Sequence, residues 1–327
     1  MTQPISRRGL LTSTAGAAAA ATMLPGLTST AHAAAHAPSI AASQPTHYGF
    51  NLGVFECSTI LDGAIQLDGP HPIFGQDQEA SAVQALAREN FLPETKMEIG
   101  FTPFLVKAGD DLVLFDTGNG AGRRPNAGNL RAQLQAGGVD PSAVSVVVIT
   151  HFHPDHIGGL MEEGSPAYPN ARYVTGEAEF DFWTAEDRMS GPTEGVAKLT
   201  AANVKPLAEK FSFIKDGAEV VSGITAINAF GHTPGHMAFN IESDGKRILL
   251  WADAANHYVH SVQRPDWHVR FDMDKDAAAA TRKTLFDMAA ADRIPVTGYH
   301  MPFPAVGYID KKADDYRWVP ASYQLKV

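Results

Sequence analysis

The sequence predicts an α/β (α+β) fold, an αββα sandwich in which two mixed β-sheets pack face to face and helices cover the outer faces. Three observations favour this class. Strand-like and helix-like segments alternate irregularly along the chain, with many hairpin signals between them. The segment 145–150 is a continuous apolar, β-branched run, typical of a strand buried on both faces. The chain has 327 residues and is 44% hydrophobic, enough for a substantial core in one large domain or two half-domains.

The spacing of apolar residues places the elements in order. Strands are predicted at 50–60, 64–67, 101–107, 111–115, 145–150, 172–175, 224–229, 237–242, 247–251 and 294–297, and helices at 79–91, 126–136, 177–187, 193–210 and 274–291. The pair Asp62-Gly63 is expected to form a hairpin turn that returns 64–67 onto 50–60. The strand at 111–115 ends at Asp116, so an acidic residue follows a strand end.

The N-terminus predicts an export signal in residues 1–33. Arg7 and Arg8 precede a weakly apolar, alanine-rich stretch, and the run 31–33 (AHA) is a small-x-small cleavage pattern. The pattern resembles a twin-arginine signal, so we expect a periplasmic or secreted protein. Polar residues and proline interrupt the apolar stretch, which is therefore not expected to span or anchor in a membrane. Residues 34–47 are expected to form a flexible leader and 48–327 the folded domain.

Charge and cysteine content narrow the classes of function. The formal net charge is −10, which argues against a nucleic-acid partner because such partners require a basic surface. Cys57 is the single cysteine, so the chain forms no internal disulfide. Its neighbours predict a strand, and we expect a buried, inert thiol.

The run 151–156 (HFHPDH) directly follows the buried strand and packs four metal-ligand side chains into six residues. His151 and His153 are two residues apart in an extended segment and can turn to one ion. Asp155 and His156 continue around a turn and can reach a second ion. Imidazole and carboxylate groups are the ligands of zinc-type ions, so the sequence predicts a dinuclear metal site.

This run and four others, in order, resemble the motifs of the metallo-β-lactamase superfamily. The matching stretches are 114–118 (LFDTG), 151–159 (HFHPDHIGG), 231–236 (GHTPGH), 249–253 (LLWAD) and 299–302 (YHMP). The resemblance covers about residues 48–325. It implies that one metal is held by His151, His153 and His236, and the other by Asp155, His156 and His300. It also implies that Asp253 bridges the ions and that Asp116 orients a ligand imidazole, while His232 is expected to be structural.

The implied activity is hydrolysis of a small molecule by a hydroxide that bridges two divalent ions, for which zinc is the default. Asp155 is expected to hold the proton of that hydroxide and to act as the catalytic carboxylate. An aspartate at 253 favours the dinuclear hydrolases over true β-lactamases, whose second site generally lacks this carboxylate. The resemblance also implies a homodimer.

Further stretches resemble the group that contains methyl parathion hydrolase and its lactonase relatives, namely 181–183 (DFW), 300–304 (HMPFP) and 316–320 (YRWVP). Trp183 matches a substrate-binding aromatic position of that group. The loop 118–124 departs from the pattern, because it offers Arg123 and Arg124 instead of an aromatic residue. We therefore rank lactones or esters first as substrates and organophosphate triesters after them. Hydrolytic dehalogenation of an activated chloroaromatic is the alternative reaction.

Two other interpretations come from different classes. A flavodiiron-type oxidoreductase would place a glutamate where this chain has Pro154 and would carry an added flavin domain, for which the chain has no room. A non-catalytic periplasmic metal-binding protein would be expected to have lost some of the ligands. Loops near 70–80 and 255–270 are expected to line or cover the pocket.

Overall fold

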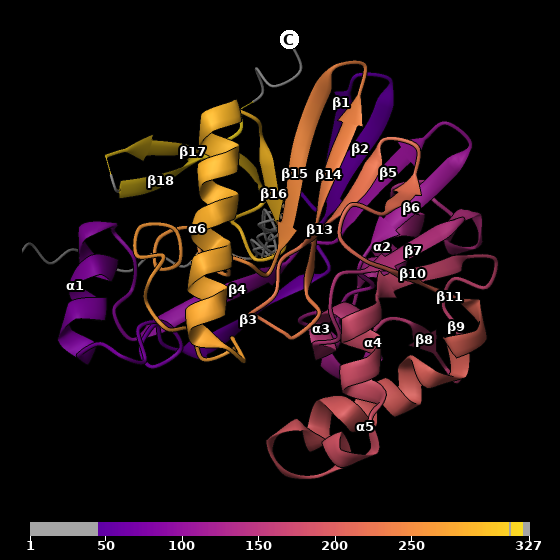
Figure 1. Cartoon of the computed structure of the whole chain (residues 1–327), viewed down its shortest axis with the longest axis horizontal. Helices are drawn as coiled ribbons and strands as arrows, with labels where there is room; N and C mark the ends of the chain where they lie inside the picture. The colour runs from indigo at the N-terminus through magenta and orange to yellow at the C-terminus, as the bar shows by residue number, and fades with distance from the viewer. Residues whose placement is uncertain (1–44, 314, 323–327) are drawn as a thin grey trace, which may run out of the picture. The chain divides into compact units, whose positions relative to one another are not determined.

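The computed structural model describes residues 45–313 and 315–322 and has the predicted αββα architecture (Figure 1). The expected export signal and most of the expected leader lie outside the described residues. Strand β1 begins at His47, the last residue assigned to the leader. His47 pairs with Ile60 in the first sheet, and its Nε2 lies 2.8 Å from the carbonyl oxygen of Gln133.

The first sheet has seven strands in the order β1-β2-β5-β6-β7-β10-β11. They are β1 (His47–Leu52), β2 (Phe55–Ile60), β5 (Phe104–Ala108), β6 (Asp111–Phe115), β7 (Val146–Ile149), β10 (Arg172–Gly176) and β11 (Phe211–Ile214). The pairs from β6 through β11 are parallel, so β6 and β7 end at the same edge. The segments that follow these two strands carry Asp116 and His151 to that edge.

The second sheet also has seven strands, in the order β12 to β18. They are β12 (Glu219–Val221), β13 (Ile224–Asn228), β14 (Met237–Ser243), β15 (Lys246–Ala252), β16 (Val296–Gly298), β17 (Val306–Lys312) and β18 (Asp315–Pro320). Strands β15 and β16 are parallel. Their ends therefore deliver Asp253 and His300 to one edge.

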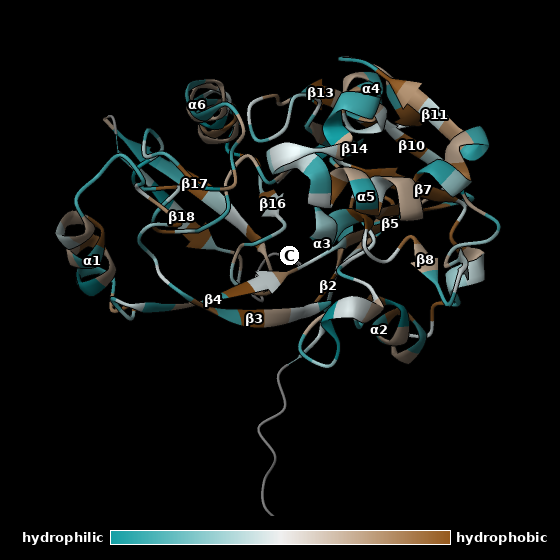
Figure 2. Cartoon of the chain, turned by 90° about the horizontal axis from the view of Figure 1, so that it is seen from below, coloured by the Kyte–Doolittle hydropathy of each residue, from teal (hydrophilic) through white to brown (hydrophobic). Residues whose placement is uncertain are grey.

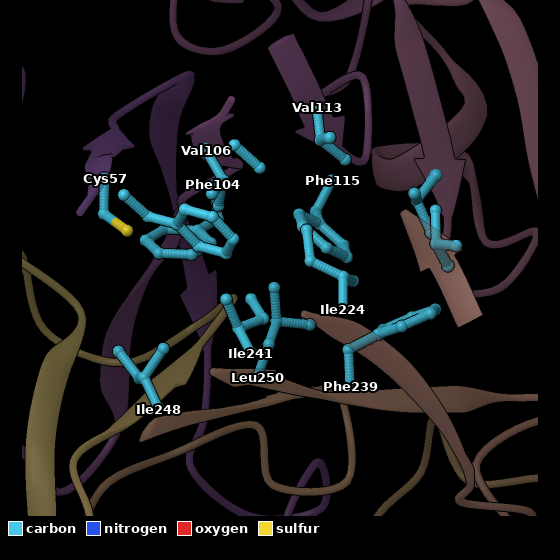
Figure 3. Packing of buried hydrophobic residues seen from close by; sticks show 14 of the residues in the cluster. Cys57, Phe104, Val106, Val113, Phe115, Ile224, Phe239, Ile241, Ile248 and Leu250 are labelled. Atoms are coloured by element: carbon cyan, nitrogen blue, oxygen red, sulfur yellow. The ribbon is translucent and has the colours of Figure 1, made fainter. Parts of the chain in front are cut away.

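The main core lies between the two sheets (Figure 3). Phe115 of the first sheet contacts Phe239 of the second edge to face, with ring centroids 5.1 Å apart. Burial of each such side chain contributes about 1.5–3 kcal/mol. Cys57 is part of this core, which confirms the prediction of a buried cysteine, and burial raises the pKa of its thiol to about 12.

Helices cover both outer faces of the sandwich. The helices are α1 (Ala80–Glu89), α2 (Leu130–Ala136), α3 (Pro154–Ile157), α4 (Glu177–Thr184), α5 (Glu194–Asn203) and α6 (Lys275–Asp292), with short 3-10 helices at Ala121–Arg123, Pro141–Ala143, Glu186–Met189, Gly191–Thr193 and Lys205–Lys210. Side chains of α2 and α4 pack on the first sheet, and those of α6 pack on the second. Among the described residues, no helix has both the length and the apolar character needed to cross a membrane.

Two strand predictions near the N-terminus are wrong. The segment 50–60 is a hairpin of β1 and β2 rather than one strand, because the chain turns at Gly53, whose φ is +58°. The pair Asp62-Gly63 does not return the chain onto β2. Strand β3 (Gly63–Asp68) pairs instead with β4 (Lys96–Phe101), and the predicted strand at 101–107 accordingly divides into β4 and β5.

The Asp62 carboxylate explains this departure. It is 1% exposed and accepts hydrogen bonds from the backbone N–H groups of Asn119, Gly128 and Leu130. Asp62 is thus a buried residue whose carboxylate holds the 118–130 loop in place, rather than a turn residue at the surface. The β3–β4 ribbon that follows runs alongside the sandwich from the α1 side to the α2 side (Figure 2). The remaining short pair is β8 (Met161–Glu162) with β9 (Ser165–Pro166).

Candidate active site

The 151–156 run occupies the edge of the sandwich where β7 ends. His151 follows Thr150 directly and is fully buried. Pro154 starts the four-residue helix α3, which carries Asp155 and His156. This short helix, rather than an extended loop, carries both side chains into the second potential metal-binding group. The glycines after it allow close packing, since a Cβ at Gly159 would lie 1.9 Å from the carbonyl oxygen of Thr117.

The first potential metal-binding group consists of His151, His153 and His232, whose ligand atoms lie within 4.8 Å of one another. His232 Nε2 lies 2.9 Å from His153 Nδ1. The other nitrogen of His232, Nδ1, donates to the carboxylate of Asp272 at 2.8 Å. A carboxylate that fixes the far nitrogen of an imidazole is the usual support of a metal ligand.

The structure places His232, rather than the predicted ligand His236, in the first potential metal-binding group. His236 Nδ1 donates to the carbonyl oxygen of Ala229 at 2.9 Å, and its Nε2 accepts the backbone N–H of Asp253 at 3.1 Å. Both nitrogens of His236 are engaged by the protein. His232, four residues earlier in the same loop, points its Nε2 into the group instead.

The second potential metal-binding group consists of Asp155, His156, Asp253 and His300. His300 Nε2 lies 3.0 Å from Asp253 Oδ2 and 3.4 Å from Asp155 Oδ2. His300 Nδ1 donates to the carbonyl oxygen of Gly100 at 2.8 Å, which orients its ring. The structure thus brings together the four side chains that the sequence analysis assigned to the second ion and the bridge.

Asp253 stands between the two groups. Its Oδ2 lies 3.4 Å from His232 Nε2 and 3.8 Å from His151 Nε2, and its Oδ1 lies 3.3 Å from His156 Nε2. One carboxylate therefore faces imidazoles from both groups, which is the position required of a bridging ligand. Asn256 donates to Asp253 Oδ2 at 3.0 Å and holds the carboxylate in this orientation.

Asp116 lies behind the second group. Its Oδ2 is 2.9 Å from His156 Nδ1, and its Oδ1 accepts the backbone N–H of Thr150. The same carboxylate thus orients an imidazole and fixes the residue before His151. The φ of Asp116 is +63°, an unusual value that turns the carboxylate toward His156 at the end of β6.

Sequence reasoning missed Glu179 on α4. Its buried carboxylate accepts four hydrogen bonds, from Phe152 N–H, Trp183 Nε1–H, the Thr233 hydroxyl and Gly235 N–H. Glu179 therefore ties the 151–153 segment to the 232–236 loop, the two segments that supply the first group. A close contact supports this link, because a Cβ at Gly235 would lie 2.1 Å from Glu179 N. A glutamate in the first turn of a helix gives no sequence signal of this role.

Burial and charge suit these groups for divalent cations. Burial, with the neighbouring His232, lowers the pKa of His153 to about 3, so the ring is neutral at pH 7, as metal binding requires. Burial also acts to lower the pKa of His156, but the carboxylates of Asp116, Asp253 and Asp155 outweigh it and raise that pKa. The buried carboxylates of Asp116 and Asp253 and the partly buried carboxylate of Asp155 thus favour a positive charge at this site.

Buried polar atoms without hydrogen-bond partners also indicate that these groups bind cations. His151 Nε2, His156 Nε2 and Asp253 Oδ1 are buried without a hydrogen-bond partner among the described residues. Each unpartnered buried group costs about 1–3 kcal/mol. Cations coordinated by these atoms would remove that cost, so the donor set fits two divalent ions bound by nitrogen and oxygen.

A cavity of about 410 Å³ opens onto both groups. It is lined by Ile65, Leu67, Ile99, Phe101, Arg123, His153, Pro154, Asp155, Asp253, Arg270, Phe271 and His300. The β3–β4 ribbon thus forms its apolar wall. The expected covering loops contribute little, since the 70–80 loop is absent from the lining and only Arg270 comes from 255–270.

The structure does not place Trp183, the predicted substrate-binding residue, in the lining of this cavity. Its side chain is 3% exposed, its indole N–H donates to Glu179, and it is not among the residues lining the cavity. Its ring centroid lies 6.4 Å from that of His153, so it packs behind a ligand. Of the two arginines in the 118–124 loop, Arg123 lines the cavity, whereas Arg124 is paired with Glu162 at 2.7 Å.

Residues 102–297 of the chain match the metallo-beta-lactamase superfamily. This segment is more than half of the 327 residues and contains every residue of the two groups except His300. The chain belongs to the metallo-beta-lactamase superfamily. The N-acyl homoserine lactonase AttM of Agrobacterium fabrum is 31% identical over 135 residues, 39% of this chain and 48% of that protein. The chain thus spans about half the length of this curated relative.

Solved structures match most of the chain. The dizinc quorum-quenching lactonase AidC, in complex with a product N-hexanoyl-L-homoserine, has 25% identity and a TM-score of 0.77 over 85% of this chain and 98% of its own. The hydrolase AbOPH has 24% identity and a TM-score of 0.80 over 86% of this chain and 99% of its own. The likeness to AbOPH shows the fold alone.

Proposed function

We propose that this protein is a dinuclear, metal-dependent hydrolase that opens a lactone or cleaves a carboxylic ester. The observation that carries the proposal is the position of Asp253, which faces His151 and His232 on one side and His156 and His300 on the other. The likeness to AidC, a dizinc lactonase, favours zinc and a lactone. The partial match to N-acyl homoserine lactonases favours the same substrate class.

Two divalent ions bound there would supply a nucleophilic hydroxide at neutral pH and would polarise the carbonyl that it attacks. The chain's own residues provide the rest. Asp155 lines the cavity, and its Oδ2 lies 3.4 Å from His300 Nε2 and 3.5 Å from His156 Nε2. A carboxylate in that position can hold a proton and pass it to the leaving oxygen. Ile65, Leu67 and Ile99 offer an apolar wall for an acyl chain.

The test is turnover by zinc-loaded protein of N-hexanoyl homoserine lactone, an aryl ester, a paraoxon-type triester and a chlorinated aromatic nitrile. We expect the lactone or the aryl ester to dominate kcat/KM, with loss of activity on chelation and recovery with zinc. The variant D155N is expected to retain metal and lose about 10²–10⁴-fold in kcat, the usual contribution of a positioned acid or base. Dominant turnover of the triester or the nitrile, or no turnover of any substrate, would contradict the proposal.

A further inference from the structure

Two arginines from distant parts of the chain, Arg123 and Arg270, line the active-site cavity. Arg123 ends a 3-10 helix in the loop after β6, and Arg270 lies between β15 and α6. Both line the cavity that contains Asp155, Asp253 and His300. Both side chains are exposed, and neither has an ion-pair partner among residues 45–313 and 315–322.

Each guanidinium is held against an aromatic ring of the cavity wall. The Arg123 guanidinium carbon lies 5.8 Å from the ring centroid of Phe101, and that of Arg270 lies 5.2 Å from the ring centroid of Phe271. Cation–π contacts of this kind position a guanidinium without using its N–H donors. Phe101 also contacts the His300 ring edge to face, with centroids 5.5 Å apart, so Arg123 is separated from the second metal-binding group by one ring.

The contrast with Arg124 shows that the Arg123 charge is not matched locally. Arg124, the next residue, makes two hydrogen bonds to the Glu162 carboxylate at 2.7 and 2.9 Å and a third to the Gly128 carbonyl oxygen. Among the described residues that line the cavity, only Asp155 and Asp253 carry carboxylates, and both belong to the second metal-binding group. The cavity therefore combines an apolar wall with two arginines that form no ion pair among the described residues.

We propose that the ester or lactone substrate carries an anionic group, which Arg123 and Arg270 bind while the scissile carbonyl lies at the metal-binding groups. This inference rests on the proposed hydrolase function and specifies its substrate class. A guanidinium fork matches the two oxygens of a carboxylate. The Ile65, Leu67 and Ile99 wall takes the apolar part of the molecule, so the site selects an amphiphilic anion over a neutral ester of the same length.

The experiment compares kcat/KM for two matched pairs of esters. One pair places the charge on the acyl side, mono-4-nitrophenyl adipate against 4-nitrophenyl hexanoate. The other places it on the leaving group, 4-carboxyphenyl hexanoate against phenyl hexanoate. Zinc-loaded wild type, R123Q, R270Q and R123K are compared with R131Q, which removes an exposed arginine on α2 outside the cavity. The readout is the ratio of anionic to neutral kcat/KM, which cancels intrinsic reactivity.

For at least one pair we expect R123Q and R270Q each to lower this ratio by about 5–10-fold. This is the effect of losing one charged hydrogen bond, reduced because the arginines are exposed to solvent. R123K should give an intermediate value, R131Q should keep the wild-type ratio, and the wild-type ratio should fall as salt is raised from about 0.05 to 0.5 M. Turnover with ratios that both glutamine variants leave unchanged in both pairs overturns this inference alone. Absence of turnover of all four esters and of the homoserine lactone overturns the proposed function as well.

Discussion

Replacing Glu179 by glutamine should weaken both folding and metal binding, because one carboxylate holds the two segments of the first group together. The carboxylate Oε1 accepts Phe152 N–H and Trp183 Nε1–H at 2.7 and 2.8 Å. Its Oε2 accepts the Thr233 hydroxyl and Gly235 N–H at 2.6 and 3.0 Å. Burial raises the pKa of Glu179 and these hydrogen bonds oppose that rise, so the site is organised around an acceptor.

The magnitude follows from counting the donors that E179Q would leave unpartnered. The glutamine carbonyl can accept Phe152 N–H and Trp183 N–H, and its amide can donate to Thr233 once that hydroxyl rotates. Gly235 N–H then has no acceptor, which costs about 1–3 kcal/mol. Loss of the charge offsets part of this cost, since the buried ion is itself unfavourable. We therefore expect E179Q to lower the free energy of unfolding by about 1–3 kcal/mol and the zinc affinity by about 10–100-fold.

The assays are urea unfolding of the metal-free protein and zinc competition with a chromophoric chelator. The matched control is E177Q on the same helix, where Glu177 is half-exposed and pairs with Lys215 at 2.7 Å, a contact worth less than about 1 kcal/mol. E179Q within about 0.5 kcal/mol of wild type, with zinc affinity changed no more than in E177Q, would refute the linking role of Glu179.

Two further predictions concern regions outside the metal-binding groups. D62N should lower the free energy of unfolding by about 1–3 kcal/mol. The NH2 group of asparagine is itself a donor, so at least one of the backbone N–H groups that now donate to Asp62 would lose its acceptor. Equal urea midpoints for D62N and the exposed control D68N would contradict this prediction. Burial lowers the pKa of His260 to about 4, below its usual 6.5. Neutral, buried His260 therefore contributes to the free energy of unfolding above pH 6.5, and up to about 3 kcal/mol of this contribution is lost as the pH falls toward 4. The free energy of unfolding of H260Q should decrease correspondingly less over that pH range. The same pH dependence in both proteins would show that His260 does not titrate as inferred.

The sequence was sufficient for the architecture and for the second metal-binding group. The buried strand before His151 and the acidic residue after β6 both follow from local patterns, since parallel strand ends meet at one edge. Local pattern did not reveal which strands would pair. The Asp62-Gly63 pair has the composition of a hairpin turn, yet the Asp62 carboxylate accepts hydrogen bonds from backbone N–H groups about 60 residues away.

The first group shows the limit of motif reasoning. Within the run 231–236 (GHTPGH), either histidine satisfies the pattern, and only the tertiary partners separate them. Asp272, which is anchored by the buried Arg282, holds His232, whereas the backbone of Ala229 and Asp253 engages His236. Glu179 was missed for the same reason, because its four donors come from three separate segments.

The proposed metal centre is dinuclear, and its first ion is held by His151, His153 and His232. The most direct measurement is the number of zinc ions per chain in purified, dialysed protein, for wild type, H232N and H236Q. We expect about two zinc ions per chain for wild type, about one for H232N and about two for H236Q. One ion or none in wild type, or loss of an ion in H236Q with two retained in H232N, would contradict it.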